Sequence, residues 1–262
     1  MKEEVLNKLK EKELEILKEV DRVCKKNNIK YFIMYGTLLG AVRHQGFIPW
    51  DDDIDICMLR SDYEKFLEIA SKELDEKFFV DYEKTNKKYY LPFAKVRNKN
   101  TQVFEEASKK YDGHKGIWID IFPYDYKKKN SYNIIDKIKF KIFHVFHVSL
   151  VKKSLKKEYS KKVSFVANFL SYKFIFRWKK ILSIHKKREK YVLHYGLEKI
   201  YETPIIAIDD IFPLKKYKFE DCEFYGPKNA DKILTDTYGD YMQLPPVEKR
   251  ITHSIEKVIF DD

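Results

Sequence analysis

The chain has 262 residues, of which 44% are hydrophobic and 16% aromatic, and this composition excludes a disordered protein. Its three cysteines lie far apart and without a C-x-x-C spacing, which excludes a disulfide framework and a cysteine zinc site and favours a reducing, cytoplasmic location. The net charge of +11 is uneven, because the segment 127–190 carries +17 and the rest of the chain −6.

The N-terminal segment predicts a helix followed by a strand. Apolar residues recur at helical spacing from Glu3 to Lys26, where acids and bases alternate instead of forming the apolar run of a signal peptide. The run from Ile29 to Tyr35 is short, aromatic and β-branched, as in strands. Gly36 and Thr37 then form a turn into a short helix. No stretch of eighteen apolar residues occurs, so the sequence predicts no membrane span.

The next segment predicts a second strand and a helix. Pro49 breaks the chain before IDICM, in which isoleucine and methionine alternate with aspartate and cysteine as in a strand with two unlike faces. Ser61 is expected to cap the following helix, with Glu64 completing a capping box. The later elements are expected as strands near 93–97, 117–122 (ended by Pro123), 205–208 and 218–224, and as helices between 131 and 190.

Four aspartates crowd into the sequence PWDDDIDI, and their repulsion is relieved most simply by a bound cation. Asp53 and Asp55 are two positions apart on the expected strand and so face the same way. Asp120, in the strand sequence IWIDIFP, could supply a third carboxylate from a neighbouring strand, and such ligands suit Mg²⁺ or Mn²⁺. A calcium EF-hand is excluded, because Ile56 and Asp62 stand where the loop requires Gly and Glu. One of these carboxylates, or a neighbouring group, could also accept a proton in catalysis.

Several other residues are candidates for binding phosphate. Gly36 and Thr37 precede a helix N-terminus, a common seat for anions, although many such turns only serve packing. Lys95 and Arg97 share one face of an expected strand and could hold a diphosphate, or could form a polar face in water. Arg43 and His44, one turn further along the short helix, could also contact phosphate, or could be an exposed pair that ends the helix.

The combination of a Gly-Thr turn, an Asp-x-Asp strand and a later acid resembles the nucleotidyltransferase superfamily. More closely, YGTLLGAVRHQGFIPWDDDIDI, LPFAKVRNKNT, GIWIDIFPYD and FYGPKNADKILTDTYGDYMQLPPVEKRITH resemble the LicD family of phosphotransferases, related to the fukutin-type ribitol-phosphate transferases. The resemblance covers residues 1–125 and about 200–255. Thr37 stands where the superfamily has Ser, and Gln45 where Lys is common.

This resemblance implies an α+β fold, with a nucleotidyltransferase-like mixed sheet flanked by helices. We expect a catalytic core at 1–126, a basic helical insertion at 127–200 and a C-terminal segment at 201–262 that packs back on the core. Three further site residues, Asp240, Arg250 and His253, come to notice only through the resemblance.

The function implied is metal-dependent transfer of a phospho-alcohol from a CDP-activated donor. Phosphocholine from CDP-choline is the first choice, and the acceptor would be a hydroxyl of a cell-surface glycan or a teichoic acid precursor. Nucleic acid is not an expected partner. Two rivals remain: a nucleotidyltransferase that uses an NTP, and a non-catalytic polyanion-binding protein built on the basic segment.

The basic segment itself has two interpretations. Its lysines alternate with aromatic residues, a composition that suits contact with an anionic membrane surface, which would place the protein at the inner face of the membrane and near a lipid-linked acceptor. Alternatively, the lysines are a solvated cover and the rings are the core of a helical subdomain.

Overall fold

The computed structural model describes residues 3–106, 109–127, 134–183, 189–194, 205–250 and 255–260. Its sheet and the two additional strand pairs are built from β1 (Phe32–Ile33), β2 (Asp55–Leu59), β3 (Phe78–Asp81), β4 (Ala94–Asn98), β5 (Thr101–Glu105), β6 (Trp118–Lys127), β7 (Tyr191–His194), β8 (Ile205–Ala207), β9 (Lys215–Phe219), β10 (Cys222–Gly226) and β11 (Ile255–Phe260). The helices are α1 (Glu3–Lys26), α2 (Tyr35–His44), α3 (Arg60–Glu73), α4 (Ile134–Leu155), α5 (Lys161–Phe169), α6 (Tyr172–Ser183), α7 (Ile208–Ile211), α8 (Ala230–Tyr238) and a 3₁₀ turn at Val247–Lys249.

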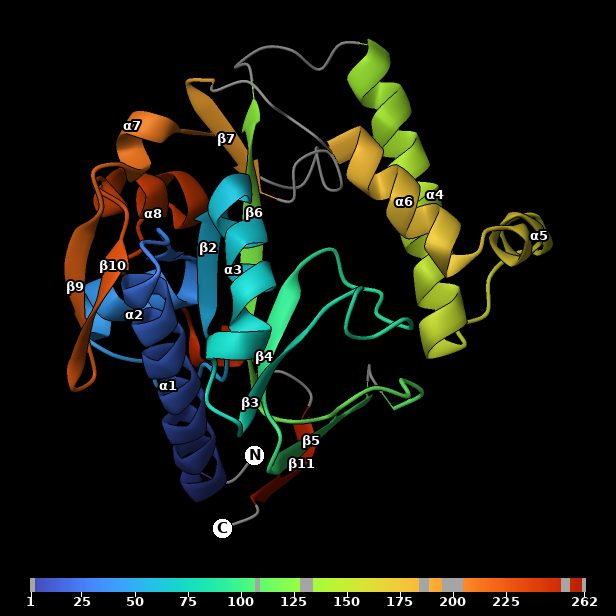
Figure 1. Cartoon of the computed structure of the whole chain (residues 1–262). Helices are drawn as coiled ribbons and strands as arrows, with labels where there is room; N and C mark the ends of the chain where they lie inside the picture. Colours follow the sequence, from blue (N-terminus) through green and yellow to red (C-terminus); the bar gives the residue numbers. More distant parts are fainter. Residues whose placement is uncertain are drawn as a thin grey trace.

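The main sheet is mixed and has β6 at its centre. The strand order is β1-β2-β6-β4-β3, and the second half of β6 also pairs with β7, which pairs with β8. Only β2 and β6 run parallel, and the other pairs in this sheet are antiparallel. Helices α1 and α3 pack against each other and against the sheet (Figure 1). The mixed sheet with its helices agrees with the expected α+β class.

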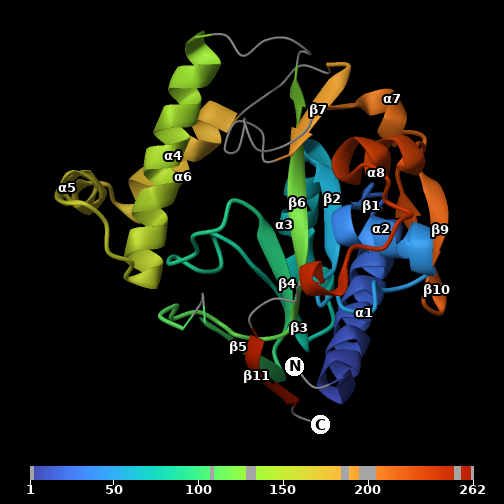
Figure 2. The same cartoon turned by 180° about the vertical axis from the view of Figure 1, so that it is seen from behind.

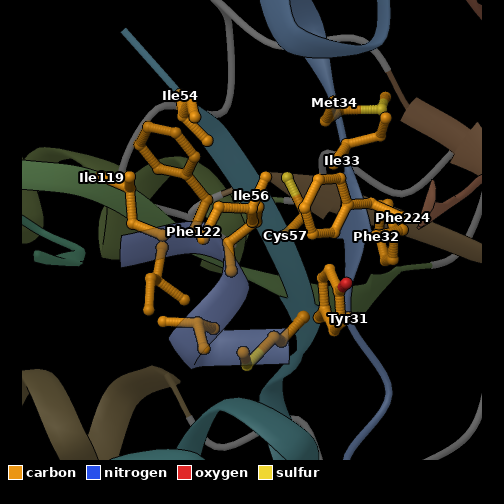
Figure 3. Close-up of a cluster of buried hydrophobic side chains, with 14 of the residues drawn as sticks. Tyr31, Phe32, Ile33, Met34, Ile54, Ile56, Cys57, Ile119, Phe122 and Phe224 are labelled. Carbon is orange, nitrogen blue, oxygen red and sulfur yellow. The ribbon is translucent and has the colours of Figure 1, made fainter. Parts of the chain in front are cut away.

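Helix α1 has the predicted bounds, Glu3–Lys26. One stripe of it is buried in the core, including Leu9, Ile16 and Leu17, because apolar residues at helical spacing line one face. The same core includes the apolar side chains of β1, β2 and β6, next to the acidic segment. Figure 3 shows Ile54, Ile56 and Cys57 of this region packed with the aromatic and aliphatic side chains of neighbouring strands.

Strand β6 does not end at Pro123, contrary to the prediction. Its residues up to Ile121 pair with β4 and those from Tyr124 pair with β7, so Pro123 lies where β6 changes its antiparallel partner. A proline lacks the N–H that a strand donates, and at this position neither antiparallel ladder requires that donor. The strand can therefore run through the proline to Lys127.

Three further local predictions differ from the structure. Helix α3 begins at Arg60 after Leu59, without a side-chain cap, so the capping box of Ser61 and Glu64 does not form. The expected single strand at 218–224 is a hairpin of β9 and β10, in which Glu220 adopts a positive φ of 56° at the turn. Helix α2 also begins earlier than expected, at Tyr35, so that Gly36 and Thr37 form its first turn instead of preceding it.

Helices α4, α5 and α6 form a unit of their own beside the sheet. They have a separate small core of Phe143, Phe146, Leu150 and Ile175. Figures 1 and 2 both show these helices on the opposite side of the molecule from the β9-β10 hairpin. Strand β7 then returns the chain to the sheet. The predicted division at 126 and 200 stays a prediction.

Among the described helices, none combines the length and the apolar character needed to cross a membrane.

Candidate active site

A row of four charged residues crosses the sheet. Asp55 of β2 lies opposite Asp120 of β6, Asp120 opposite Lys95 of β4, and Lys95 opposite Asp81 of β3. Residues directly opposite one another in neighbouring strands present their side chains on the same face of the sheet. The expected position of Asp120 on a strand next to Asp55 is thus confirmed, and the isoleucines on either side of each aspartate are fully buried in the core.

The first turn of α2 holds the acidic segment in place. The backbone N–H of Asp55 donates to the hydroxyl oxygen of Thr37 at 2.8 Å, and Thr37 is buried. A Cβ added to Gly36 would lie 2.5 Å from Oδ2 of Asp51 and 4.0 Å from Oδ1 of Asp53. The glycine is therefore required for the carboxylates to approach the helix N-terminus. Strand β2 begins only at Asp55, so Asp53 precedes the strand on which it was predicted.

The electrostatics of this cluster are dominated by negative charge. Burial raises the pKa of Asp55 well above its ordinary value, and Asp53, Asp120 and Asp51 raise it further. Lys95 opposes this effect, and its Nζ lies 2.6 Å from Oδ1 of Asp120. Burial lowers the pKa of Lys95, while Asp120 favours its charged form. Lys95 is thus the cation that balances one of several neighbouring carboxylates.

Sequence reasoning missed Glu13, a fifth acid beneath the cluster. Glu13 is 3% exposed, and among the described residues its Oε2 has no hydrogen-bond partner. Burial raises its pKa well above the ordinary value, and Asp53 is the largest of the charges that raise it further. A sequence signal did exist, since position 13 lies four residues from both Leu9 and Leu17, within the apolar stripe of α1.

A cavity of about 190 Å³ opens beside the charged row. Its walls combine charged groups with several aromatic rings. The lining residues are Asp53, Tyr89, Tyr90, Leu91, Phe93, Lys95, Arg97, Val103, Glu105, Tyr111, His114, Lys115, Trp118 and Asp120. The sequence did not indicate this set, because its aromatic members come from three separate segments.

Lys95 and Arg97 share a strand face as predicted, but this face is not solvated. The two side chains are buried, and both contribute to the cavity wall. Arg97 donates from Nε to Oδ2 of Asp81 at 2.8 Å and from a terminal nitrogen to the carbonyl of Gly116 at 3.0 Å. Both cations also lie over the ring of Trp118, with Nζ of Lys95 at 4.2 Å and the Arg97 guanidinium carbon at 5.3 Å from its centroid. Phosphate binding by this pair stays a prediction.

Arg43, His44 and Arg250 gather around Trp50, just before the acidic segment. Arg43 donates to Nε2 of His44 at 2.9 Å and to the carbonyl of Tyr241 at 2.6 Å. The guanidinium of Arg250 lies 4.5 Å from the centroid of the Trp50 ring. Burial, and then the charge of Arg250, lower the pKa of Arg43. The C-terminal segment therefore packs against the end of α2. Substrate binding by Arg43, His44 and Arg250 stays a prediction.

The remaining C-terminal candidates differ in their placement. Asp240 is exposed, and His253 lies outside the described residues. Tyr238, the last residue of α8, was missed by sequence reasoning. The residue as a whole is 44% exposed, but desolvation of its hydroxyl, and then the charges of Asp55 and Asp51, raise its pKa, which places the hydroxyl in the field of the carboxylates.

The described ranges contain no group of three His, Cys, Asp or Glu side chains arranged to hold a metal ion as they stand. Metal binding by Asp53, Asp55 and Asp120 therefore stays a prediction.

Comparison with known proteins identifies the family. The model of the LicD/FKTN/FKRP nucleotidyltransferase domain matches residues 28–170. The chain is 29% identical over 93% of its length to the lipopolysaccharide cholinephosphotransferase LicD of Haemophilus influenzae, of which it covers 94%. It is also 44% identical over 87% of its length to the uncharacterized protein RP689 of Rickettsia prowazekii, of which it covers 54%. It is 34% identical over half its length to the uncharacterized protein RT0683 of Rickettsia typhi, of which it covers 40%. Since the family model spans more than half of the sequence, including Asp53, Asp55 and Asp120, the chain belongs to the LicD family.

Proposed function

We propose that this protein transfers phosphocholine from CDP-choline to a glycan hydroxyl. One observation carries the proposal: the acids Asp53 and Asp120, two buried cations and several aromatic rings line the same cavity. A phosphocholine group needs both environments, because its phosphate requires cationic charge around it and its trimethylammonium group is attracted to the faces of aromatic rings. The similarity to a lipopolysaccharide cholinephosphotransferase supports lipopolysaccharide as the first acceptor to test.

The aromatic part of the cavity lining suits a quaternary ammonium group. Tyr90 and Tyr111 meet edge to face with their centroids 5.3 Å apart, and Glu105 adds a carboxylate to the same lining. The ring of Trp118 is already engaged by Lys95 and Arg97, so Tyr90 and Tyr111 are the rings we assign to choline. A choline group between these rings would gain about 0.5–2 kcal/mol for each favourable cation–π contact.

The cluster of carboxylates suits a divalent cation. Asp53, Asp55 and Asp120 place three carboxylates near one another, with Glu13 buried beneath them and Lys95 as the cation paired with Asp120. Oxygen ligands of this kind match Mg²⁺ or Mn²⁺, and rotation of the aspartate side chains would be required to bring them into coordination. When bound, such an ion would neutralise charge on the diphosphate of the donor.

The chain's own residues would carry the rest of the reaction. The hydroxyl oxygen of the acceptor forms a bond to the phosphorus that bears choline, the bond from that phosphorus to the CMP oxygen breaks, and CMP leaves. A carboxylate of the cluster takes the proton of the hydroxyl. Lys95, fixed between Asp120 and Trp118, places its ammonium group where it can stabilise a phosphate oxygen.

The test is a donor panel with lipopolysaccharide that lacks phosphocholine as acceptor. We expect CDP-choline with Mn²⁺ or Mg²⁺ to give CMP and phosphocholine-modified acceptor, with CDP-ethanolamine and CDP-ribitol as comparisons. Replacing Tyr111 by Leu should raise KM for CDP-choline more than KM for CDP-ethanolamine, while Phe260→Leu, outside the cavity lining, serves as the matched control. Consumption of an NTP with release of pyrophosphate, and no CMP from any CDP-alcohol, would instead establish the nucleotidyltransferase rival.

A further inference from the structure

Exposed apolar side chains concentrate on the helical unit α4–α6. Of the thirteen exposed large hydrophobic residues in the described part of the chain, nine lie on these three helices. They are Ile134, Ile138, Val145, Phe165, Val166, Phe169, Phe174, Trp178 and Ile181. Soluble domains rarely leave large apolar side chains clustered at the surface, so a concentration of this kind marks a contact surface.

These residues form a stripe on each helix. Phe174, Trp178 and Ile181 follow one another at helical spacing along α6, and Phe165 and Phe169 do so along α5. The exposed fractions reach 75% at Phe169 and 66% at Phe165. The stripes are distinct from the inner faces of α4 and α6, which pack on their own small core. The alternative that all these rings form a helical core therefore accounts for only some of them.

The charge around the stripes indicates what they contact. Segment 127–190 carries a net charge of +17. Exposed cations flank the apolar side chains directly, with Lys141 between Ile138 and Val145 on α4, and Lys173 and Arg177 beside Phe174 and Trp178 on α6. Phenylalanine and tryptophan on one face, bordered by lysine and arginine, is the composition of helices that lie in the interface of an anionic bilayer. Contact between two copies of this unit would bring two segments of the same charge together.

We propose that α4, α5 and α6 dock this protein on the surface of an anionic lipid bilayer, with the exposed rings in the interface and the lysines at the headgroups. This surface contact is separate from the proposed transfer reaction. It also agrees with the lack of any helix suited to span a membrane among the described residues.

The experiment is sedimentation of the full chain with vesicles. Vesicles of phosphatidylcholine alone are compared with vesicles of equal parts phosphatidylcholine and phosphatidylglycerol, each at low salt and at about 0.15 M salt. We expect binding to the anionic vesicles that weakens with salt. Lys161→Glu with Lys173→Glu should reduce that affinity at least about 25-fold, since each interfacial lysine contributes about fivefold.

Matched variants separate the apolar contribution from general effects. Phe165→Ser with Phe169→Ser should reduce binding to anionic vesicles, whereas Leu244→Ser with Val247→Ser, which changes exposed apolar residues elsewhere, should not. Lys215→Glu with Lys218→Glu, on exposed positions of β9, is the matched charge control. Circular dichroism and CMP release with a soluble acceptor should be unchanged in all four variants.

Two outcomes would overturn the proposal. One is equal, negligible sedimentation of the wild-type protein with anionic and neutral vesicles at low salt. The other is a stable dimer in light scattering that Phe165→Ser with Phe169→Ser dissociates, without vesicle binding by the monomer, which would assign the stripes to contact between copies of this chain. Loss of transfer activity with intact vesicle binding would count against the proposed function alone.

Discussion

Replacing Asp55 by Asn should have opposite effects on stability and activity if the carboxylate cluster exists to bind a cation. In the metal-free protein the pKa of Asp55 is raised by burial and by Asp53, Asp120 and Asp51, so its ionised form is disfavoured in the folded state. When the pKa of a carboxyl group is higher in the folded state, its burial costs no stability below the unfolded pKa, which is 3.8 for Asp55. The free energy of unfolding then falls as the pH rises from that value toward the folded pKa. At neutral pH, Asp55→Asn removes that penalty and should raise Tm, by about 2–4 °C for each kcal/mol of free energy gained.

With metal bound, the wild-type protein should instead be more stable than Asp55→Asn. A ligand present at about a hundred times its Kd stabilises the folded state by about 2.7 kcal/mol, which corresponds to a Tm increase of about 5–10 °C for a chain of this size. The wild-type protein should show this increase with Mn²⁺, and Asp55→Asn should lose it, because an amide is a much weaker ligand than a carboxylate. The transfer rate of Asp55→Asn, and likewise of Asp53→Asn, should fall on the order of a thousandfold.

Differential scanning fluorimetry measures the Tm without metal and its increase with Mn²⁺, and an assay of CMP release measures the transfer rate. Asp112→Asn is a suitable control, since Asp112 is exposed and pairs with Lys88 outside the cluster. If Mn²⁺ raised the Tm of wild type and Asp55→Asn equally, or if Asp55→Asn kept activity within a few fold at saturating metal, the carboxylates would not be the metal site.

Three more perturbations test the surroundings of the cluster. Gly36→Ala should keep the fold but reduce kcat about a hundredfold, because the added Cβ meets the carboxylate of Asp51 at 2.5 Å and misplaces it; wild-type kcat would contradict this. Arg97→Met should lower the free energy of unfolding in urea by about 3–5 kcal/mol, because it leaves the buried carboxylate of Asp81 without its cation. Adding Asp81→Leu should restore most of that loss, whereas additive losses would show that the two residues are not coupled. Glu13→Gln should make the metal-free protein more stable than wild type at pH 7 and equally stable below about pH 4.5, because the pKa of Glu13 is raised in the folded state. Urea unfolding at both pH values measures this difference in the free energy of unfolding.

The parts of the site that sequence predicted are those encoded by local periodicity. Alternation along two strands correctly placed Asp55 and Lys95 on faces opposite their apolar neighbours. The spacing of apolar residues gave α1 its bounds. Both depend only on residues a few positions apart, so a single segment contains the necessary information.

The parts that sequence did not predict depend on contacts between distant segments. Arg43 is held by the carbonyl of Tyr241, and Arg97 by Asp81 and Gly116. Nothing in the local sequence of Arg97 distinguishes a buried, paired guanidinium from an exposed one. The strand through Pro123 likewise depends on a change of pairing partner that only the assembled sheet defines.

The cavity and the helical unit share a wall, which joins the two proposals physically. Tyr90 lines the cavity and also packs against the small core of α4 and α6. The hydroxyl of Ser154, on α4, donates to the carbonyl of Lys88 in the same loop. Because Tyr90 belongs both to the cavity wall and to the packed cluster, a protein docked through α4–α6 would hold the cavity at a fixed distance from the bilayer. An acceptor glycan anchored in that bilayer would then meet the cavity without a separate search in solution, and under both proposals the helices α4–α6 would assist transfer by proximity.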